Sequence, residues 1–223
     1  MRNTEFASHV HDVFAHGLDL VERLDIAKRT GREKELDFEA EHGRILALFW
    51  PEGEVAENPD FKGTPSGFLG ARYALACWLD ELFIPRTPTS DWDKAWAEAS
   101  MEYRVFGTTQ QRAWRFWQQA KLAAAQTRAG TDALEVYLWC FALGFKGEPD
   151  PEVVKDPHAW ANTTRGNLIK SRNQPFPHET GLPLRRPIRV LTGRQAFNRM
   201  TTFVTLAAAA AGLALMYYQL KPN

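Results

Sequence analysis

The sequence predicts an all-α protein in which a helical body is followed by one C-terminal transmembrane helix. Apolar residues recur with a period near 3.6 through most of the chain, and no clear hairpin signal appears. A run of 21 residues without a formal charge, 200–220, lies close to the C-terminus. The 223 residues suffice for a real core, and a hydrophobic content of 44% argues against a disordered chain.

The N-terminal part of the chain predicts two helices and then an irregular segment. The first helix is expected over 5–29 and is closed by Gly31. Its apolar stripe consists of Phe6, Val10, Val13, Phe14, Leu18, Val21 and Leu24. A second helix is expected over 34–49, because Pro51 stops it. Residues 52–66 contain several glycines and prolines and predict a long loop.

Residues 67–83 predict a buried central helix, because they are apolar on nearly every side. Its last turn nevertheless carries Asp80 and Glu81, and exposed acidic groups there oppose the helix dipole by roughly 0.3–1 kcal/mol each. We interpret this placement as a sign of a buried partner, such as an arginine, or of a docking surface. Solubility at a helix end is the plain alternative.

Capping signals predict the later helices. Two residue pairs have the spacing of a capping box, namely Ser90 with Asp93 and Thr108 with Gln111. Gly130 is expected to close a helix that ends near Arg128, and Asp132 and Glu135 start the next one. That helix has an apolar stripe of Leu134, Tyr137, Leu138, Phe141, Ala142 and Phe145. Two Asp-Pro pairs, 150–151 and 156–157, resemble an N-cap followed by proline, and the second opens a helix to Lys170.

The chemistry-bearing side chains favour packing over catalysis. The six histidines lie in no metal-binding motif and are interpreted as solvated helix positions. Cys77 and Cys140 lie in apolar runs, which favours packing over nucleophilic roles. Helical spacing favours core packing over base stacking for Trp92, Trp96, Tyr103, Phe106, Trp114, Phe116 and Trp117. No phosphate-binding loop or nucleophile elbow occurs, so we expect no enzyme, no metal and no cofactor.

The formal net charge of zero conceals an acidic body and a basic tail. The last acidic residue is Glu179, and six of the 27 basic residues follow it, which leaves 21 basic against 27 acidic residues before it. An acidic body argues against a nucleic acid as partner.

The uncharged run predicts a membrane anchor over 199–221. A helix of 21 residues spans about 31 Å, close to the roughly 30 Å of a hydrocarbon core. Five arginines upstream place the body in the cytoplasm by the positive-inside rule. Ala208 and Gly212 have the spacing through which membrane helices self-associate. The alternative is a soluble, alanine-rich core helix.

The chain is therefore expected to have three parts. A cytoplasmic helical domain covers 1–172, a linker rich in proline and arginine covers 173–198, and the anchor covers 199–221.

Two segments carry a resemblance to a known family. Residues 72–81 read RYALACWLDE and resemble the RYALCAxxDE signature of the DotU/TssL family, which is also called IcmH. Residues 132–147 read DALEVYLWCFALGFKG and resemble that family's DLLELYYLCLxLGFxG segment. Both segments are long and stand in the family's order. The family's stretch with Gly-Gly-Glu between them is missing, because residues 102–117 keep only its aromatic residues.

The resemblance implies an inner-membrane component of a type VI secretion system or its type IVB counterpart. Family members have a cytoplasmic domain of two small helical bundles, shaped like a hook, and one C-terminal transmembrane helix with a periplasmic end. They self-associate, so a homodimer is expected, and they join an IcmF/TssM-like membrane protein and help dock the baseplate.

The resemblance also implies a protein-binding surface that involves Arg72, Tyr73, Asp80 and Glu81. The leading hypothesis is thus a non-enzymatic scaffold whose acidic cleft near the last two residues recruits partners. A membrane-tethered adaptor outside secretion and a membrane-tethered hydrolase remain as alternatives.

Overall fold

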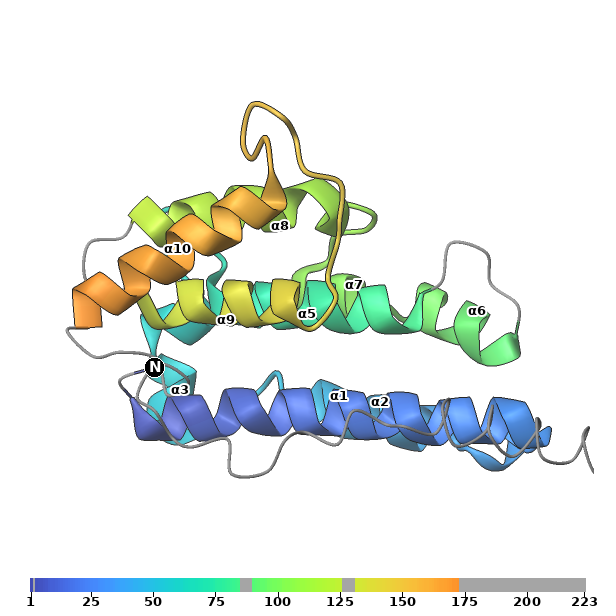
Figure 1. The fold of residues 1–223 in the computed structure, drawn as a ribbon. Coiled ribbons are helices and arrows are strands. Elements are labelled where there is room, and N and C mark those ends of the chain that lie inside the picture. Colours follow the sequence, from blue (N-terminus) through green and yellow to red (C-terminus); the bar gives the residue numbers. More distant parts are fainter. Residues whose placement is uncertain (2, 85–89, 126–130, 173–223) are drawn as a thin grey trace, which may run out of the picture. The chain divides into compact units, whose positions relative to one another are not determined.

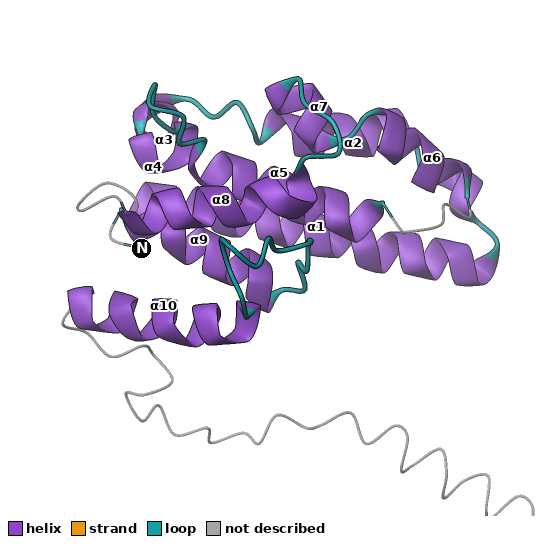
Figure 2. Ribbon diagram, turned by 90° about the horizontal axis from the view of Figure 1, so that it is seen from above, coloured by secondary structure: helices purple, strands orange, loops and turns teal. Residues whose placement is uncertain are grey.

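The computed structural model describes residues 1, 3–84, 90–125 and 131–172. Every regular element in these ranges is helical, which confirms the all-α prediction for this part of the chain (Figures 1 and 2). By its contacts the chain separates into two units, Met1–Asn173 and Gln174–Asn223, and the description below concerns the first. The predicted linker and anchor lie outside the described residues. Within these residues, no helix is both long and apolar enough to cross a membrane.

Ten α-helices and one short 3-10 helix are described, with bounds as follows. They are α1 Thr4–Thr30, η1 Glu33–Glu35, α2 Phe38–Ala47, α3 Gly53–Glu57, α4 Pro59–Lys62, α5 Gly70–Phe83, α6 Asp91–Glu98, α7 Met101–Phe106, α8 Arg112–Ala125, α9 Thr131–Ala142 and α10 Pro157–Arg172.

Helix α1 matches its prediction to within one residue at each end. The Asn3 side chain accepts a hydrogen bond from the backbone N–H of Phe6, and Gly31 ends the helix in the left-handed region at φ 69°. The predicted stripe is wrong at Leu18, which is 43% exposed, whereas Leu20 is fully buried. The buried face is therefore rotated slightly from the face that the sequence indicated.

The segment after α1 differs from the prediction in two places. The expected helix over 34–49 begins only at Phe38, because Asp37 caps it by accepting from the N–H of Ala40. The expected loop over 52–66 contains α3 and α4. The Asn58 side chain caps α4 and a proline follows at its first position, a signal that the sequence analysis overlooked.

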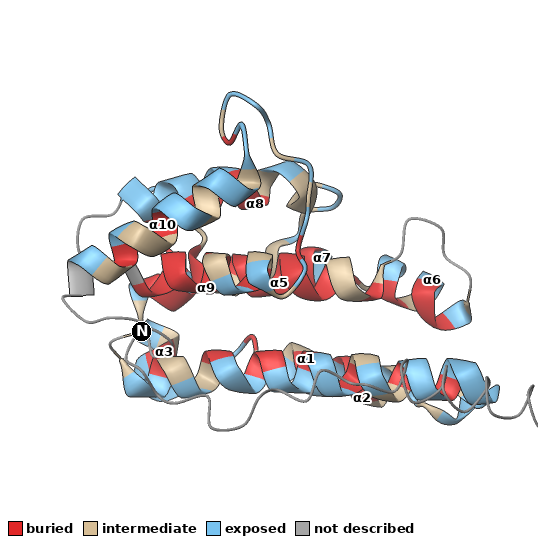
Figure 3. Cartoon of the chain, viewed as in Figure 1, coloured by how far each residue is buried: buried red, intermediate tan, exposed pale blue. Residues whose placement is uncertain are grey.

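Helix α5 is the central helix, as predicted. It contacts α1, α4, α6, α7, α8 and α9. Eight consecutive residues, from Tyr73 to Asp80, are 0% exposed, and Figure 3 shows the buried positions along α5 and α9. The helix begins at Gly70 rather than residue 67, and a Cβ on Gly70 would lie 2.1 Å from the carbonyl oxygen of Phe61. The predicted division into two bundles, with a hook-like outline, stays a prediction.

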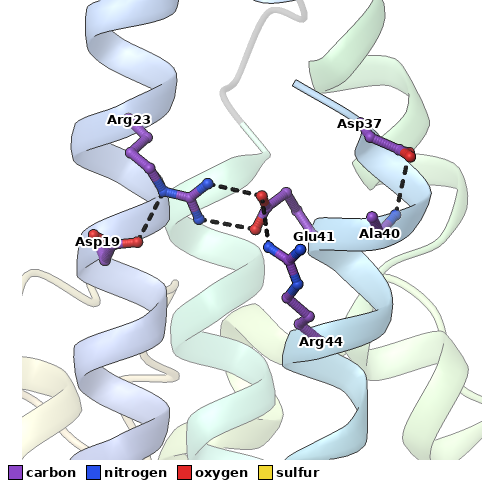
Figure 4. Close-up of polar contacts among 6 residues, drawn as sticks. All are labelled: Asp19, Arg23, Asp37, Ala40, Glu41 and Arg44. Atoms are coloured by element: carbon purple, nitrogen blue, oxygen red, sulfur yellow. Dashed lines mark hydrogen bonds and ion pairs between the residues drawn. The ribbon is translucent and has the colours of Figure 1, made fainter. Parts of the chain in front are cut away.

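The carboxylate of Glu41 on α2 links this helix to α1 (Figure 4). The guanidinium of Arg23 donates to both carboxylate oxygens of Glu41, at 2.7 and 2.8 Å, and its Nε donates to Asp19 at 2.8 Å. Arg44 donates to Glu41 at 3.0 Å. The hydrogen bond from Arg23 lowers the pKa of Glu41 below its usual range. Since Glu41 is 8% exposed, this pair joins the two helices near the core rather than at the open surface.

The later capping predictions had mixed outcomes. The capping box of Ser90 with Asp93 is confirmed at the start of α6. The box of Thr108 with Gln111 is wrong, because the Thr108 hydroxyl and the Gln111 N–H both donate to the buried Glu102. Asp156 caps α10 as predicted, whereas the pair at 150–151 forms only a turn. The predicted helix end near Arg128 and Gly130 lies outside the described residues.

Aromatic side chains fill much of the core. Packing is confirmed for Trp92, Trp96, Phe116 and Trp117, which are at most 4% exposed. Phe106 is half-buried, whereas Tyr103 and Trp114 are 50% and 41% exposed, so packing is wrong for these two. Cys77 and Cys140 are buried free thiols, as predicted, and burial raises the pKa of both.

Candidate functional site

The four residues of the predicted protein-binding surface all lie on α5, but only two of them reach the surface. Tyr73 and Asp80 are 0% exposed, whereas Arg72 and Glu81 are half-buried. The two buried side chains therefore offer no atoms to a partner in this structure. A contact role for Arg72 and Glu81 stays a prediction.

The carboxylate of Asp80 holds the start of α7. It accepts from the indole N–H of Trp96 at 3.0 Å and from the backbone N–H groups of Met101 and Glu102 at 2.7 and 2.8 Å. Burial raises its pKa to about 6, although these three donors favour the charged form. The buried partner expected for this acid is thus a helix N-terminus and an indole rather than an arginine.

A second buried carboxylate, that of Glu102, continues this network. The phenolic OH of Tyr73 donates to Glu102 at 3.0 Å, while Thr108 and the N–H of Gln111 donate at 3.3 and 3.2 Å. Burial strongly raises the pKa of Tyr73. The residues around Asp80 and Glu102 therefore join α5 to α7 and to the start of α8. Glu102 could not be predicted from the sequence, because it lies outside the signature and nothing in its spacing relates it to Tyr73.

Arg72 lies beside these residues, at the wall of a groove. Its guanidinium carbon is 5.0 Å from the centre of the Trp50 ring and 5.4 Å from that of Phe106. Its Nε is buried and has no hydrogen-bond partner in the part of the chain that the structure describes. Burial lowers the pKa of Arg72, and no ion pair to an acid is present among the described residues. Trp50 itself is 57% exposed.

The two segments that carry the family resemblance pack against each other. Helices α5 and α9 have the most extensive contact in the described chain, and the OH of Tyr137 donates to the carbonyl oxygen of Gly70 at 3.1 Å. A sequence model of the family described as type VI secretion system protein DotU matches residues 62–221. The chain belongs to the DotU family. No curated protein and no solved structure matches it.

Membership in the DotU family makes the chain a component of a type VI secretion system, and it confirms the resemblance seen in the sequence. DotU proteins are structural components of the secretion machinery rather than a family of enzymes. The match extends through the C-terminal segment, in which the predicted self-association residues Ala208 and Gly212 lie outside the described residues.

The histidines of this DotU chain are not all solvated. His42 is 4% exposed, and its Nε2 lies 2.7 Å from the carbonyl oxygen of Ala99. His9 is half-buried, with its Nε2 at 2.9 Å from the carbonyl oxygen of Leu48. Burial lowers the pKa of both. The prediction of solvated positions is therefore wrong for His42. Among the residues that the structure describes, no group of three or more His, Cys, Asp or Glu side chains is placed to hold a metal ion.

An apolar groove between α1 and α9 was not foreseen from the sequence. Its volume is about 390 Å³, and it is lined by residues of both helices, including Leu18 and Trp139. These two side chains are 43% and 41% exposed. The sequence analysis placed Leu18 in the buried stripe of the first helix and made no prediction for Trp139, since exposure of one side of an apolar helix depends on which neighbours cover it.

Proposed function

We propose that this protein is a non-enzymatic scaffold subunit of a type VI secretion membrane complex. It docks cytoplasmic baseplate components and an IcmF/TssM-like partner at the bacterial inner membrane. The observation that carries the proposal is the match of residues 62–221 to the DotU family, which covers both signature helices and the C-terminal segment. That match also favours this role over an adaptor outside secretion.

A scaffold role is supported by how the chain uses its polar groups. The carboxylates of Asp80 and Glu102 accept hydrogen bonds from neighbouring helices, and the two thiols are buried with raised pKa values. A membrane-tethered hydrolase that uses Asp80 as a base would need this carboxylate to face a substrate, whereas it is 0% exposed. We therefore favour a scaffold over the hydrolase.

The proposed arrangement places 1–172 in the cytoplasm and a C-terminal anchor over 199–221 in the membrane. The basic residues after Glu179 support this orientation, and the acidic body disfavours nucleic acid as a partner. We further propose a homodimer, to which Ala208 and Gly212 contribute by close helix approach.

The docking surface is tested at Glu81, the signature acid that reaches the surface. Glu81→Lys reverses one charge in the last turn of α5, where a lysine suits the helix dipole, so the fold is retained. The matched control is Glu98→Lys, which makes the same change on an exposed residue in the last turn of α6. Asp80→Lys is unsuitable, because it buries a lysine among backbone donors.

The measurement is co-purification of the full-length chain with the co-expressed IcmF/TssM-like protein and baseplate components. We expect Glu81→Lys to reduce recovery of at least one of them by about threefold or more, because rim charges govern capture. Glu98→Lys should retain wild-type recovery. Unchanged recovery by a folded Glu81→Lys variant would show that this end of α5 is not the docking surface.

A further inference from the structure

A groove beside the start of α5 is lined by two cations, Lys62 and Arg72, by the acid Glu57 and by several apolar side chains. We call it the Trp50–Arg72 groove; its volume is about 400 Å³, and the residues used below that line it are Trp50, Pro51, Lys62, Pro65 and Arg72. The first two precede α3, Lys62 ends α4, and Arg72 lies in the first turn of α5. The groove is thus built from α4, the first turn of α5 and the segments before α3 and after α4, and α4 packs against both α3 and α5.

Arg72 is the unusual member of this groove, because its charge is not balanced within the described chain. By contrast, Arg23 donates to both carboxylate oxygens of Glu41, and Arg115 donates to the amide oxygen of Gln111. Arg72 donates no hydrogen bond there, and its Nε is fully enclosed. Buried polar atoms are ordinarily hydrogen-bonded, so the lone Nε marks a half-buried guanidinium that has no protein acceptor among the described residues. Two aromatic rings orient the guanidinium but accept no hydrogen bond from it.

The other cation of the groove, Lys62, already has an acidic partner, Glu57, which also lines the groove. The ammonium of Lys62 donates to the carboxylate of Glu57 at 2.5 Å. A ligand therefore meets one unpaired, planar guanidinium, which matches a singly charged carboxylate in two parallel hydrogen bonds. A doubly charged phosphate would leave one of its charges without a free cation in this groove, and it has no side chain to place on the apolar walls. Trp50, Pro51 and Pro65 add apolar walls that suit an aliphatic side chain next to the carboxylate.

We propose that the Trp50–Arg72 groove binds an aspartate or glutamate side chain of a partner protein, presented beside an apolar residue. The carboxylate accepts hydrogen bonds from the guanidinium of Arg72, and the neighbouring apolar side chain packs on the exposed Trp50 ring. This inference rests on the proposed docking function, and it assigns that function a partner chemistry and a second contact point besides Glu81.

The test uses the full-length chain in detergent, with tryptophan replaced biosynthetically by 5-fluorotryptophan. The fluorine signal of Trp50 is assigned with Trp50→Phe. The probes are N-acetyl-glutamyl-leucine amide, its glutaminyl counterpart and inorganic phosphate. We expect the glutamyl peptide to shift the Trp50 signal saturably with millimolar affinity, and at least about tenfold more tightly than the other two probes.

Two variants assign the shift to Arg72. Arg72→Met should abolish it, and Arg72→Lys should weaken binding at least about fivefold, because an ammonium lacks the planar pair of donors. Arg104→Met, the matched control, removes an exposed arginine of α7 that does not line the groove and should leave affinity within about threefold. The signals of the buried tryptophans report folding of each variant. If Arg72→Met does not fold, the comparison of glutamyl and glutaminyl peptides on the wild type decides.

The proposal fails if the Trp50 signal does not move, if the glutaminyl peptide or phosphate binds as tightly as the glutamyl peptide, or if folded Arg72 variants bind normally. Failure with intact co-purification of the secretion partners would remove the carboxylate site and leave the scaffold function standing. If the wild-type chain does not co-purify with any secretion partner, this result would instead contradict the scaffold function.

Discussion

The carboxylate of Asp80 connects residues that are 16 to 22 positions away along the chain. It accepts hydrogen bonds from two backbone N–H groups at the start of α7 and from the indole N–H of Trp96, which would otherwise need water as an acceptor. These donors lie in the buried interior, where no solvent can substitute for the carboxylate. A signature residue that seemed suited to a surface is thus required by the fold.

Asp80→Ala should destabilise the protein strongly. Removal of the carboxylate leaves three buried donors unsatisfied, while relief of a buried charge offsets part of the cost, so we expect a loss of about 2–4 kcal/mol. At about 2–4 °C per kcal/mol this lowers the melting temperature by about 4–16 °C, measured by circular dichroism. Glu81→Ala next to it should change stability by less than about 0.5 kcal/mol. Equal melting temperatures would contradict the capping role.

Asp60 makes the stability of the protein depend on pH. It is 9% exposed, its Oδ2 accepts from the N–H of Asp132 at 3.3 Å, and its Oδ1 has no hydrogen-bond partner within 3.5 Å among the described residues. Burial, together with repulsion from the Asp132 carboxylate, raises its pKa from 3.8 to about 6. The folded state therefore binds a proton more tightly than the unfolded state. Ionisation of Asp60 therefore destabilises the folded state. This destabilisation is present in full above about pH 6 and disappears as the pH falls toward 4.

The comparison that isolates this effect is wild type against Asp60→Asn at pH 8 and at pH 5. An amide cannot ionise, so the variant should gain stability relative to wild type at pH 8. Between pH 8 and pH 5 this advantage should shrink by about 1–2 kcal/mol, or about 2–8 °C in relative melting temperature. Taking the difference between the two proteins cancels the opposing titration of His9 and His42, whose pKa values are lowered. A constant difference would rule out ionisation of Asp60 in this range.

At the scale of elements, the contact between α1 and α5 depends on one glycine. A Cβ added to Gly17 would lie 2.8 Å from both a Leu79 methyl carbon and the Trp78 ring, which are fully buried. We expect Gly17→Ala to cost about 1–3 kcal/mol through overpacking, although alanine favours a helix. Gly43→Ala in α2 meets nothing within 4 Å and should instead stabilise the protein by about 0.5–1 kcal/mol. Both changes in the free energy of unfolding are measured by urea denaturation. Changes of opposite sign would support the close approach of α1 and α5, and two stabilising changes would contradict it.

Elements whose signals are local were predictable from the sequence. Helices α1 and α5 have long apolar patterns, and α6 and α10 have a side chain that caps the first turn. The errors occur where a distant group decides the outcome. Glu102 takes the hydroxyl that was expected to cap α8, and the packing of α1 selects Leu20 over Leu18. Sequence spacing carries no information on either contact.

At the scale of the whole molecule, the candidate site was predictable as a location but not as chemistry. The signature correctly identified α5 as the element that carries Arg72, Tyr73, Asp80 and Glu81. A linear pattern does not reveal that Asp80 is buried against α7 while Glu81 stays half-exposed, because this depends on how six other helices pack around α5. Likewise, the Trp50–Arg72 groove combines residues that are 22 positions apart and became apparent only from the packing of α4 and α5.

The uncharged run after the basic residues gives the remaining prediction, which concerns the anchor over 199–221. We expect the full-length chain to stay in the membrane pellet after carbonate extraction, because its uncharged run has the length of a membrane span. Ala209→Arg combined with Leu213→Arg places two charges near the centre of this run, each costing about 2.5–3.5 kcal/mol on insertion scales. This variant should move to the supernatant, whereas Ala209→Leu with Leu213→Ile should not. A wild-type chain that carbonate extracts would refute the anchor, and the basic residues around the run would then need a different explanation.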